Sequence, residues 1–165
     1  MEVDRRLPQI EIQPGESHLA LEPGILRTIL GSCVGITFWV KRLRIGALCH
    51  PMLPTAAAPH ASPLNPTQNR RYVDIAIHDM SQQLAALGVN RRETEVKLFG
   101  GADVLNVNDR SFRPSVGCLN REAAVRVLRA EGYRLVASSV GGQVGVQIQF
   151  NTANGEVLLR RFARV

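Results

Sequence analysis

Short runs of apolar and β-branched residues dominate the first third of the chain. Residues 24–30, 34–40 and 44–50 each form such a run, and turn-forming or polar residues separate them. Runs of this length and composition are typical of strands, and short connections favour antiparallel neighbours. The three segments are therefore predicted to form an antiparallel meander.

A different period, with apolar residues every three or four positions, predicts a helix over 71–87. Gly88 directly after this segment is a suitable helix stop. A second helix is expected to begin at Asn120, a good N-cap residue, and to end at Gly132. The apolar residues that share one face of the first helix are Val73, Ile77, Met80, Leu84 and Leu87.

Four more strands are predicted at 95–99, 135–140, 144–151 and 156–162. The pair Asn154-Gly155 between the last two indicates a hairpin, because a type I′ turn needs two residues that tolerate positive φ. The strands come in runs and do not alternate strictly with helices. The predicted fold class is therefore α+β, a layered α/β sandwich with a mostly antiparallel or mixed β-sheet and two main helices.

The 165 residues are predicted to form one domain, 1–165. Within it, residues 1–20 are expected to be an N-terminal extension or edge strand. Residues 51–69 hold five of the nine prolines and predict a long loop, because proline disrupts helix interiors and central strands. A loop of this length either covers a functional site or is a mobile surface insertion.

Charge and cysteine usage narrow the setting of the protein. A net charge of +6 favours acidic partners. The arginines are scattered and aromatic residues make up only 5% of the chain, which argues against a nucleic-acid binder. Three cysteines without a disulfide-type spacing indicate a reducing compartment. No apolar leader and no stretch long enough to span a bilayer is visible, so the sequence predicts a cytoplasmic protein without membrane insertion.

Residues 30–35, Leu-Gly-Ser-Cys-Val-Gly, place Cys33 on a bend between two predicted strands. Glycine permits a tight bend, and such a bend exposes a sulfur while neighbouring N–H groups point at the same space. Those N–H groups could form an oxyanion hole for acyl transfer. Free cysteines are also commonly small buried core residues, and both interpretations stay open at this point.

His50 is the candidate base for Cys33. A hairpin made of 34–40 and 44–50 returns His50 to a position beside residue 33. An unassisted thiol is only a few per cent ionised at neutral pH, so a nucleophilic cysteine needs such a base. Cys49 then points to the opposite face of its strand and belongs to the core. Cys118 is expected in a turn.

Two other chemistries fit the sequence less well. Ser32 is a weaker nucleophile candidate, because Cys33 occupies the centre of the G-x-Nuc-x-G frame and a strand follows it where a helix would follow a true nucleophile elbow. A zinc site is disfavoured, because no CxxC, HxH or HExxH spacing occurs. The sequence therefore predicts neither a metal nor a cofactor.

The segments around Cys33 and His50 resemble the CheD family, the chemoreceptor glutamine deamidases of bacterial and archaeal chemotaxis. Residues 28–34 (TILGSCV) are similar to the family's T-L-L-G-S-C-V string, and residues 45–54 (IGALCHPMLP) to its I-G-(G/A)-x-x-H-x-M-L-P string. Further similar strings are 71–74 (RYVD), 98–102 (LFGGA), 116–120 (VGCLN), 141–142 (GG), 150–152 (FNT) and 154–155 (NG).

The resemblance implies a protein-glutamine deamidase that needs no cofactor and acts on the cytoplasmic domain of a chemoreceptor. Cys33 would then attack the carboxamide of a receptor glutamine and form a thioester, while His50 takes the thiol proton and passes it to the departing ammonia. Thr28 would help to orient His50, and Ser32 and Gly31 would lie at the substrate and oxyanion site. The family also allows a CheC-type phosphatase as a further partner.

The chain departs from the family pattern in two places. Some relatives have the threonine six positions before the cysteine, where this chain has Arg27; Thr28 lies five positions before, on the other face of the strand. Ser139 stands where relatives often have aspartate, and Val146-Gln147 stand where they often have arginine and lysine. These changes concern docking more than chemistry. The alternative function is therefore a catalytically weak CheD-like binding module that regulates chemotaxis proteins.

Overall fold

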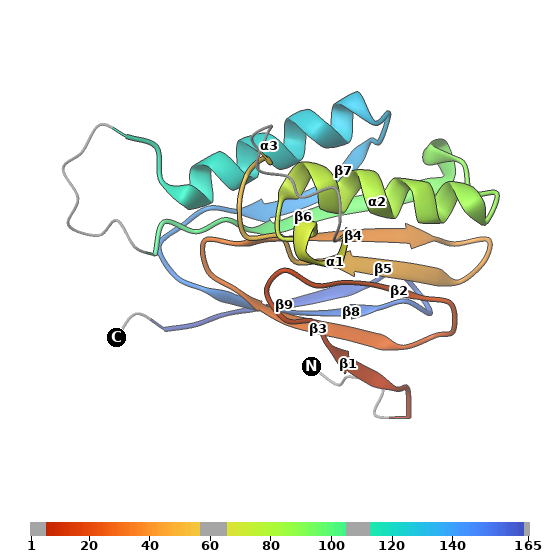
Figure 1. The fold of residues 1–165 in the computed structure, drawn as a ribbon. Helices are drawn as coiled ribbons and strands as arrows, with labels where there is room; N and C mark the ends of the chain where they lie inside the picture. The colour runs from red at the N-terminus through yellow and green to blue at the C-terminus, as the bar shows by residue number, and fades with distance from the viewer. Residues whose placement is uncertain (1–5, 57–65, 105–112, 164–165) are drawn as a thin grey trace.

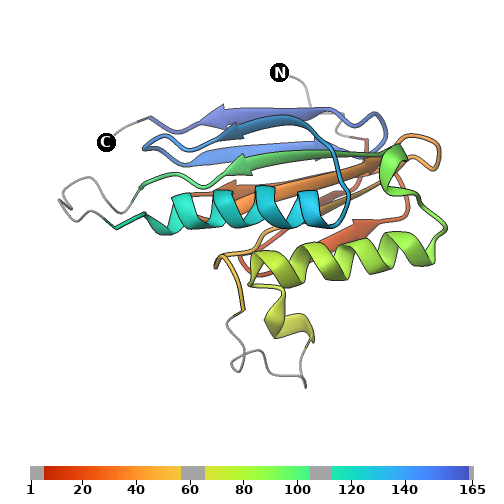
Figure 2. The same ribbon diagram turned by 90° about the horizontal axis from the view of Figure 1, so that it is seen from above.

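The computed structural model describes residues 6–56, 66–104 and 113–163. Its elements form three layers: two long helices lie side by side on one face of a five-stranded sheet, and a four-stranded sheet covers the other face (Figure 1, Figure 2). This arrangement confirms the predicted α+β sandwich with two main helices. Residues 1–5 of the predicted extension and 57–65 of the predicted loop lie outside the described residues.

The five-stranded sheet has the order β2-β5-β4-β6-β7, and the four-stranded sheet has the order β1-β3-β8-β9. No helix in the described ranges is long and apolar enough to cross a lipid bilayer. The strands are β1 Gln9–Glu11, β2 Ser17–Ala20, β3 Ile25–Leu30, β4 Val34–Val40, β5 Ile45–Cys49, β6 Thr94–Gly100, β7 Leu135–Val140, β8 Val146–Asn151 and β9 Val157–Arg161. The helices are α1 Pro66–Asn69, α2 Val73–Ala86 and α3 Val116–Ala130, with a 3-10 helix, η1, at Arg91–Glu93.

Two apolar cores hold the three layers together. The core between the helices and the five-stranded sheet includes Phe38 and Leu128, and the core between the two sheets includes Leu26 and Phe150. All seven residues of β4 are buried. Because successive side chains of a strand point to opposite faces, β4 contributes to both cores: Phe38 to the first and Trp39 to the second.

The predicted meander is correct for only two of its three strands. β4 and β5 form the expected antiparallel hairpin, but β3 pairs with β8 in the other sheet. The chain therefore crosses from one sheet to the other between Leu30 and Val34. The prediction failed because a pattern of apolar residues reports which faces are buried and does not report which strand lies alongside.

The helices begin and end at different residues than predicted. The N-cap of α3 is Ser115, whose side chain accepts a hydrogen bond from the N–H of Cys118 at 3.0 Å. Cys118 therefore lies in the first turn of the helix, and Asn120 lies inside the helix with its side chain fully buried. Serine and asparagine are equally good N-caps, so residue type could not choose between the two. Leu87 is the C-cap of α2 and is exposed, so it does not belong to the buried stripe.

A hairpin joins β8 and β9 as predicted, but its turn is not of type I′. Gly155 has a φ of 79°, whereas Asn154 does not have a positive φ. The Oδ1 atom of Asn154 instead accepts the N–H of Glu156 at 3.0 Å. In the same loop, the Oδ1 atom of Asn151 accepts the N–H of Ala153 at 2.9 Å. Asparagine side chains that bond to the backbone two residues ahead stabilise a longer loop than two residues.

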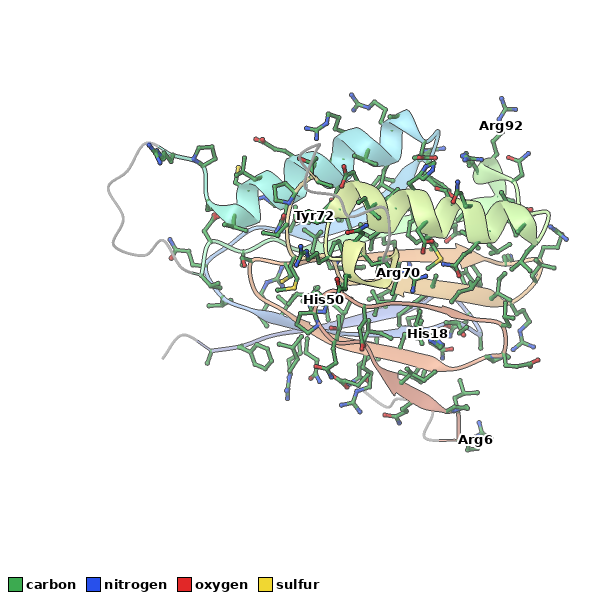
Figure 3. All side chains as sticks on the ribbon, viewed as in Figure 1. Arg6, His18, His50, Arg70, Tyr72 and Arg92 are labelled. Carbon is green, nitrogen blue, oxygen red and sulfur yellow. The ribbon has the colours of Figure 1, made fainter. Side chains whose placement is uncertain are left out.

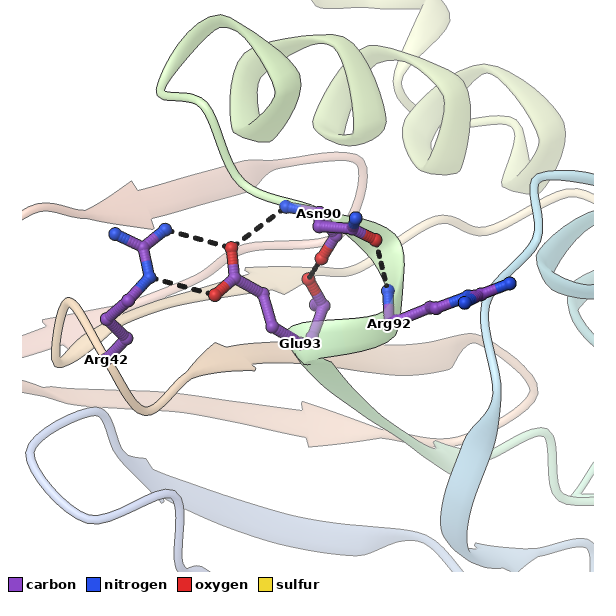
Figure 4. A network of polar contacts seen from close by, with 5 residues as sticks. Arg42, Asn90, Arg92 and Glu93 are labelled. Carbon is purple, nitrogen blue, oxygen red and sulfur yellow. Dashed lines mark hydrogen bonds and ion pairs between the residues drawn. The ribbon is translucent and has the colours of Figure 1, made fainter.

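A network of polar contacts holds the turn between β4 and β5 against η1 (Figure 4). Two hydrogen bonds of 2.9 Å run from the Arg42 guanidinium to the Glu93 carboxylate, which also accepts the N–H of Asn90 at 2.9 Å. The Oδ1 atom of Asn90 accepts the N–H of Arg92, which completes a capping box. Hydrogen bonds from Arg42 and then from Asn90 lower the pKa of Glu93 to about 2. The network lies at the end of β4 that is remote from Cys33.

Candidate functional site

Cys33 lies on the tight crossing between the two sheets. Its carbonyl accepts the N–H of Gly101 at 2.7 Å, and the carbonyl of Gly31 accepts the N–H of Ala102 at 2.8 Å. Gly100 has a φ of 83°, and a Cβ atom there would lie 2.6 Å from the Cys33 carbonyl oxygen. Glycine is therefore required at this position, and the end of β6 holds the crossing in place.

The carbonyl groups of this crossing accept hydrogen bonds, but not all of its backbone N–H groups donate one. Those of Gly31 and Ser32 have no acceptor among the residues that the structure describes. Unpaired donors beside a nucleophile can bind the oxygen of a tetrahedral intermediate. The crossing thus offers backbone donors at the positions where the sequence predicted an oxyanion site.

His50 follows β5 and is only 1% exposed (Figure 3). The Oγ1 atom of Thr28 lies 2.7 Å from Nδ1 of His50 and donates its own proton to the carbonyl of Ile12 at 2.6 Å. A hydroxyl has a single proton to donate. Nδ1 must therefore carry the hydrogen that joins the ring to Thr28. This tautomer leaves Nε2 unprotonated, so Nε2 can accept a proton.

Strand alternation determines which residue of β3 contacts His50. Thr28 shares the buried face of β3 with Leu26 and Leu30, which pack in the core between the two sheets. Arg27 points to the other face, where its Nη1 atom donates to Oε1 of Gln9 at 2.8 Å. The structure therefore places Thr28, and not Arg27, against His50.

The backbones of Cys33 and His50 lie next to each other at the shared end of β4 and β5. The residues that follow them are hydrogen-bonded, because the N–H of Val34 donates to the carbonyl of Pro51 at 3.3 Å. In the described part of the chain, however, Sγ of Cys33 forms no hydrogen bond with the His50 ring. A proton transfer between them therefore requires a side-chain movement, as is common for catalytic pairs in the absence of substrate.

Asn120 connects the Cys33 crossing to the segment that follows His50. Its side chain is fully buried, and Nδ2 donates to the carbonyls of Ser32 at 2.9 Å and Met52 at 3.0 Å. Its Oδ1 atom is buried without a partner among the described residues. Sequence reasoning missed this contact and predicted an N-cap. The one available signal was the place of Asn120 in the VGCLN string, which indicates no chemistry by itself.

The segment between β1 and β2 encloses His50 from the N-terminal side. The N–H of His50 donates to the carbonyl of Glu16 at 2.9 Å, and its carbonyl accepts the N–H of Gly15 at 2.7 Å. Ile12 supplies the carbonyl that receives the Thr28 hydroxyl. Ile12 could not be found from the sequence, because a backbone carbonyl gives no residue-type signal.

Burial shifts both candidate groups toward their neutral forms. It raises the pKa of the Cys33 thiol, although the residue's own N–H opposes that shift. Burial also lowers the pKa of His50, against the opposing effects of the Ile12 carbonyl and the Glu16 charge. The resting pair at neutral pH is therefore a thiol and a neutral imidazole. Such a pair can act by general base catalysis as the sulfur attacks.

The other two cysteines lie apart from this chemistry. Cys49 is fully buried in the core between helices and sheet, as predicted, and burial raises its pKa to about 12. Cys118 is a free cysteine on α3. In residues 6–56, 66–104 and 113–163, no three His, Cys, Asp or Glu side chains come together in a way that could hold a metal ion.

Two solved structures match this chain at low similarity. YlmD from Geobacillus stearothermophilus has a TM-score of 0.46 and 16% identity, with 75% of this chain and 48% of that chain covered. The hypothetical protein YfiH from Bacillus licheniformis has a TM-score of 0.43 and 10% identity, with 77% and 49% covered. At these values the likeness supports no conclusion about this chain.

Sequence comparison gives a much closer set of relatives. A protein of Geobacter sulfurreducens named "Probable chemoreceptor glutamine deamidase CheD 2" is 39% identical over 159 residues, which cover 96% of this chain and 93% of the relative. A "Probable chemoreceptor glutamine deamidase CheD" of Maridesulfovibrio salexigens is 37% identical over 160 residues, covering 94% and 93%. Another, from Thermococcus kodakarensis, is 36% identical over 155 residues, covering 93% and 92%. A sequence model described as "CheD chemotactic sensory transduction" matches residues 52–161. On this match and these alignments, the chain belongs to the CheD family.

Proposed function

We propose that this protein is a cysteine-dependent protein-glutamine deamidase that acts on the cytoplasmic domain of a chemoreceptor. The names of the relatives support the activity and the substrate class. The observation that carries the proposal is the 2.7 Å contact between Thr28 and His50, which leaves Nε2 as a free base beside the Cys33 crossing. A cytoplasmic location follows from the substrate.

The first half of the reaction forms a thioester. Nε2 of His50 takes the proton of Cys33 while Sγ bonds to the carbonyl carbon of a glutamine side chain. The carbonyl oxygen becomes an oxyanion, and the unpaired N–H groups of Gly31 and Ser32 stabilise it. His50 then gives its proton to the amide nitrogen, the C–N bond breaks, and ammonia leaves.

The second half of the reaction hydrolyses the thioester. His50 takes a proton from water, and the water oxygen bonds to the thioester carbon. The C–S bond breaks, the sulfur is reprotonated, and the glutamine has become glutamate. Thr28 and Asn120 are positioning residues in this scheme: Thr28 holds the tautomer of His50, and Asn120 holds the crossing near the segment after His50.

Ammonia release from a purified receptor cytoplasmic fragment tests the proposal, with mass spectrometry of the fragment as a second readout. The wild-type protein should convert glutamine to glutamate, and Cys33→Ala should abolish both signals. Cys118→Ala is the matched control and should keep full activity, because that cysteine lies on α3 outside the site. Ammonia release that survives in Cys33→Ala would refute the proposed chemistry.

A catalytically weak binding module is the second candidate. It is favoured by the missing hydrogen bond between Cys33 and His50 in the described residues, and by Ser139, which stands where the family pattern given above often has aspartate. A wild-type protein that binds the receptor fragment tightly and releases no ammonia would establish it. A CheC-type phosphatase as a regulatory partner stays a prediction.

A further inference from the structure

An apolar groove with a volume of about 580 Å³ lies between α3 and β7. Leu98 of β6 and Leu135 of β7 contribute apolar surface to it. Val125 on α3 and Val140 on β7 also line it and are exposed. β7 is the edge strand of the five-stranded sheet, so no further strand flanks the groove on this side. The groove is therefore an open apolar surface on the helix-covered face of the sheet.

The charges that line the groove are mostly positive. Arg126 and Arg129 have no acidic partner among the described residues, whereas Arg121 donates to the carbonyl of Gly101 and pairs with Asp103 at 3.7 Å. Two unpaired guanidinium groups beside an apolar surface attract a segment that carries acidic residues next to an apolar stripe.

One end of the groove lies at the same end of the five-stranded sheet as the Cys33 crossing. β6 and β7 run parallel and end side by side, with Gly100 opposite Val140. α3 begins at the same end, where a Cβ atom on Gly117 would lie 2.6 Å from the carbonyl oxygen of Gly101. Gly101 in turn donates its N–H to the carbonyl of Cys33. The Val140 end of the groove therefore lies two strands from Val34, the residue that directly follows Cys33.

We propose that this groove binds the substrate protein as an amphipathic helix with acidic residues beside its apolar stripe, and so brings a neighbouring glutamine to Cys33. The inference rests on the proposed deamidase function. The groove lies beside α3 in the helix layer, where a helix packs, and not in the plane of the sheet, where an added strand would pair with β7. From Arg121 to Ala130 it follows α3 for about 14 Å, which accommodates apolar anchors at positions i, i+4 and i+7 of a bound helix.

Two groove variants test the proposal: Val125→Asp places a charge in the apolar surface, and Arg126→Glu combined with Arg129→Glu reverses the positive charge. The control variant is Lys41→Glu combined with Arg92→Glu, which reverses two exposed charges near the end of β4 that is remote from Cys33. Each is compared with the wild-type protein on a receptor cytoplasmic fragment and on a short unstructured peptide that contains the same glutamine.

The groove variants should raise KM for the fragment by about tenfold or more and leave kcat/KM for the peptide unchanged. The control should change neither value. Binding of the fragment is also measured in a Cys33→Ala background, where it does not depend on turnover, and Kd should rise with KM. Groove variants with a wild-type Kd would overturn the proposal. This result is also expected if the substrate binds as an added strand that pairs with β7. If the wild-type protein turns over neither substrate, the deamidase function fails, while the Kd values still decide whether the groove binds the fragment.

Discussion

Replacement of Asn120 by alanine removes a side chain that bonds both to the Cys33 crossing and to the segment after His50. Its Nδ2 atom donates to the carbonyl of Ser32 at 2.9 Å and to that of Met52 at 3.0 Å. In the variant these two carbonyls lose their common donor. The crossing that contains Cys33 is then free to shift relative to His50.

The expected loss of stability follows from two hydrogen bonds. Each is worth about 1 kcal/mol net, and an acceptor that stays buried without a partner costs about 1 kcal/mol or more in addition. The loss of Oδ1, which is buried without a partner among the described residues, offsets part of this cost. We therefore expect a decrease of about 2–4 kcal/mol in the free energy of unfolding. The expected loss in kcat is separate, because a displacement of about 1 Å between reacting groups costs up to about 100-fold in rate.

The matched control is Thr152→Val, which also removes two hydrogen bonds from a buried residue. Oγ1 of Thr152 accepts the N–H of Gly24 at 2.9 Å and donates to its carbonyl at 3.2 Å. This contact lies at the end of β3 opposite to Cys33. Denaturant unfolding gives the stability of both variants, and ammonia release gives kcat and KM at a temperature where both are folded.

Both variants should lose stability, and only Asn120→Ala should lose kcat, by about 10- to 100-fold with little change in KM. If Asn120→Ala keeps the kcat of Thr152→Val, the side chain is a structural contact and does not position the site. The same result would show that the two catalytic segments are held together by the paired strands alone.

Three further predictions concern the titrating groups and their neighbours. Thr28→Val should lower kcat by about tenfold or more, because His50 loses the acceptor that fixes its tautomer. Arg27→Ala, on the outer face of β3, should leave kcat unchanged. Equal rates of the two variants in steady-state assays would contradict the role of Thr28. The decline in kcat/KM of the wild-type protein at falling pH should be centred below pH 6.5, because burial lowers the pKa of His50 from its ordinary value of 6.5 and the base must be unprotonated. A decline centred above 6.5 would contradict the assignment. The pKa of Cys49 is about 12 in the folded protein and 9.0 in the absence of burial, so this thiol's contribution to stability is complete below pH 9 and should decrease by about 1 kcal/mol per pH unit above it. Denaturant titrations should show a shallower alkaline loss in Cys49→Ala.

Local patterns predicted the elements well and their neighbours poorly. The stripe at Val73, Ile77, Met80 and Leu84 correctly predicted α2, because the helical period is a property of the segment itself. The partner of β3 could not be predicted, because β8 lies more than a hundred residues further along the chain and its apolar alternation fits several neighbours.

The site shows the same division between local and long-range information. Cys33 and His50 could be predicted as neighbours, because a single hairpin connects them. Asn120 and Ile12 could not, because one reaches the site from a distant helix and the other acts through a backbone carbonyl. The sequence could also not choose between Thr28 and Arg27 until the strand faces were known.

The position of Cys33 between the sheets makes the chemistry sensitive to how the two sheets stack. Thr28 belongs to the four-stranded sheet and His50 to the end of the five-stranded one, so a small sliding of one layer over the other separates acceptor from ring without breaking a single strand. Gly46 and Phe150 show how little space separates the layers, since a Cβ atom at Gly46 would lie 2.8 Å from the Phe150 ring. We therefore expect Gly46→Ala to keep native circular dichroism and to lower turnover. In this fold, retained secondary structure is no guarantee of an intact reaction centre.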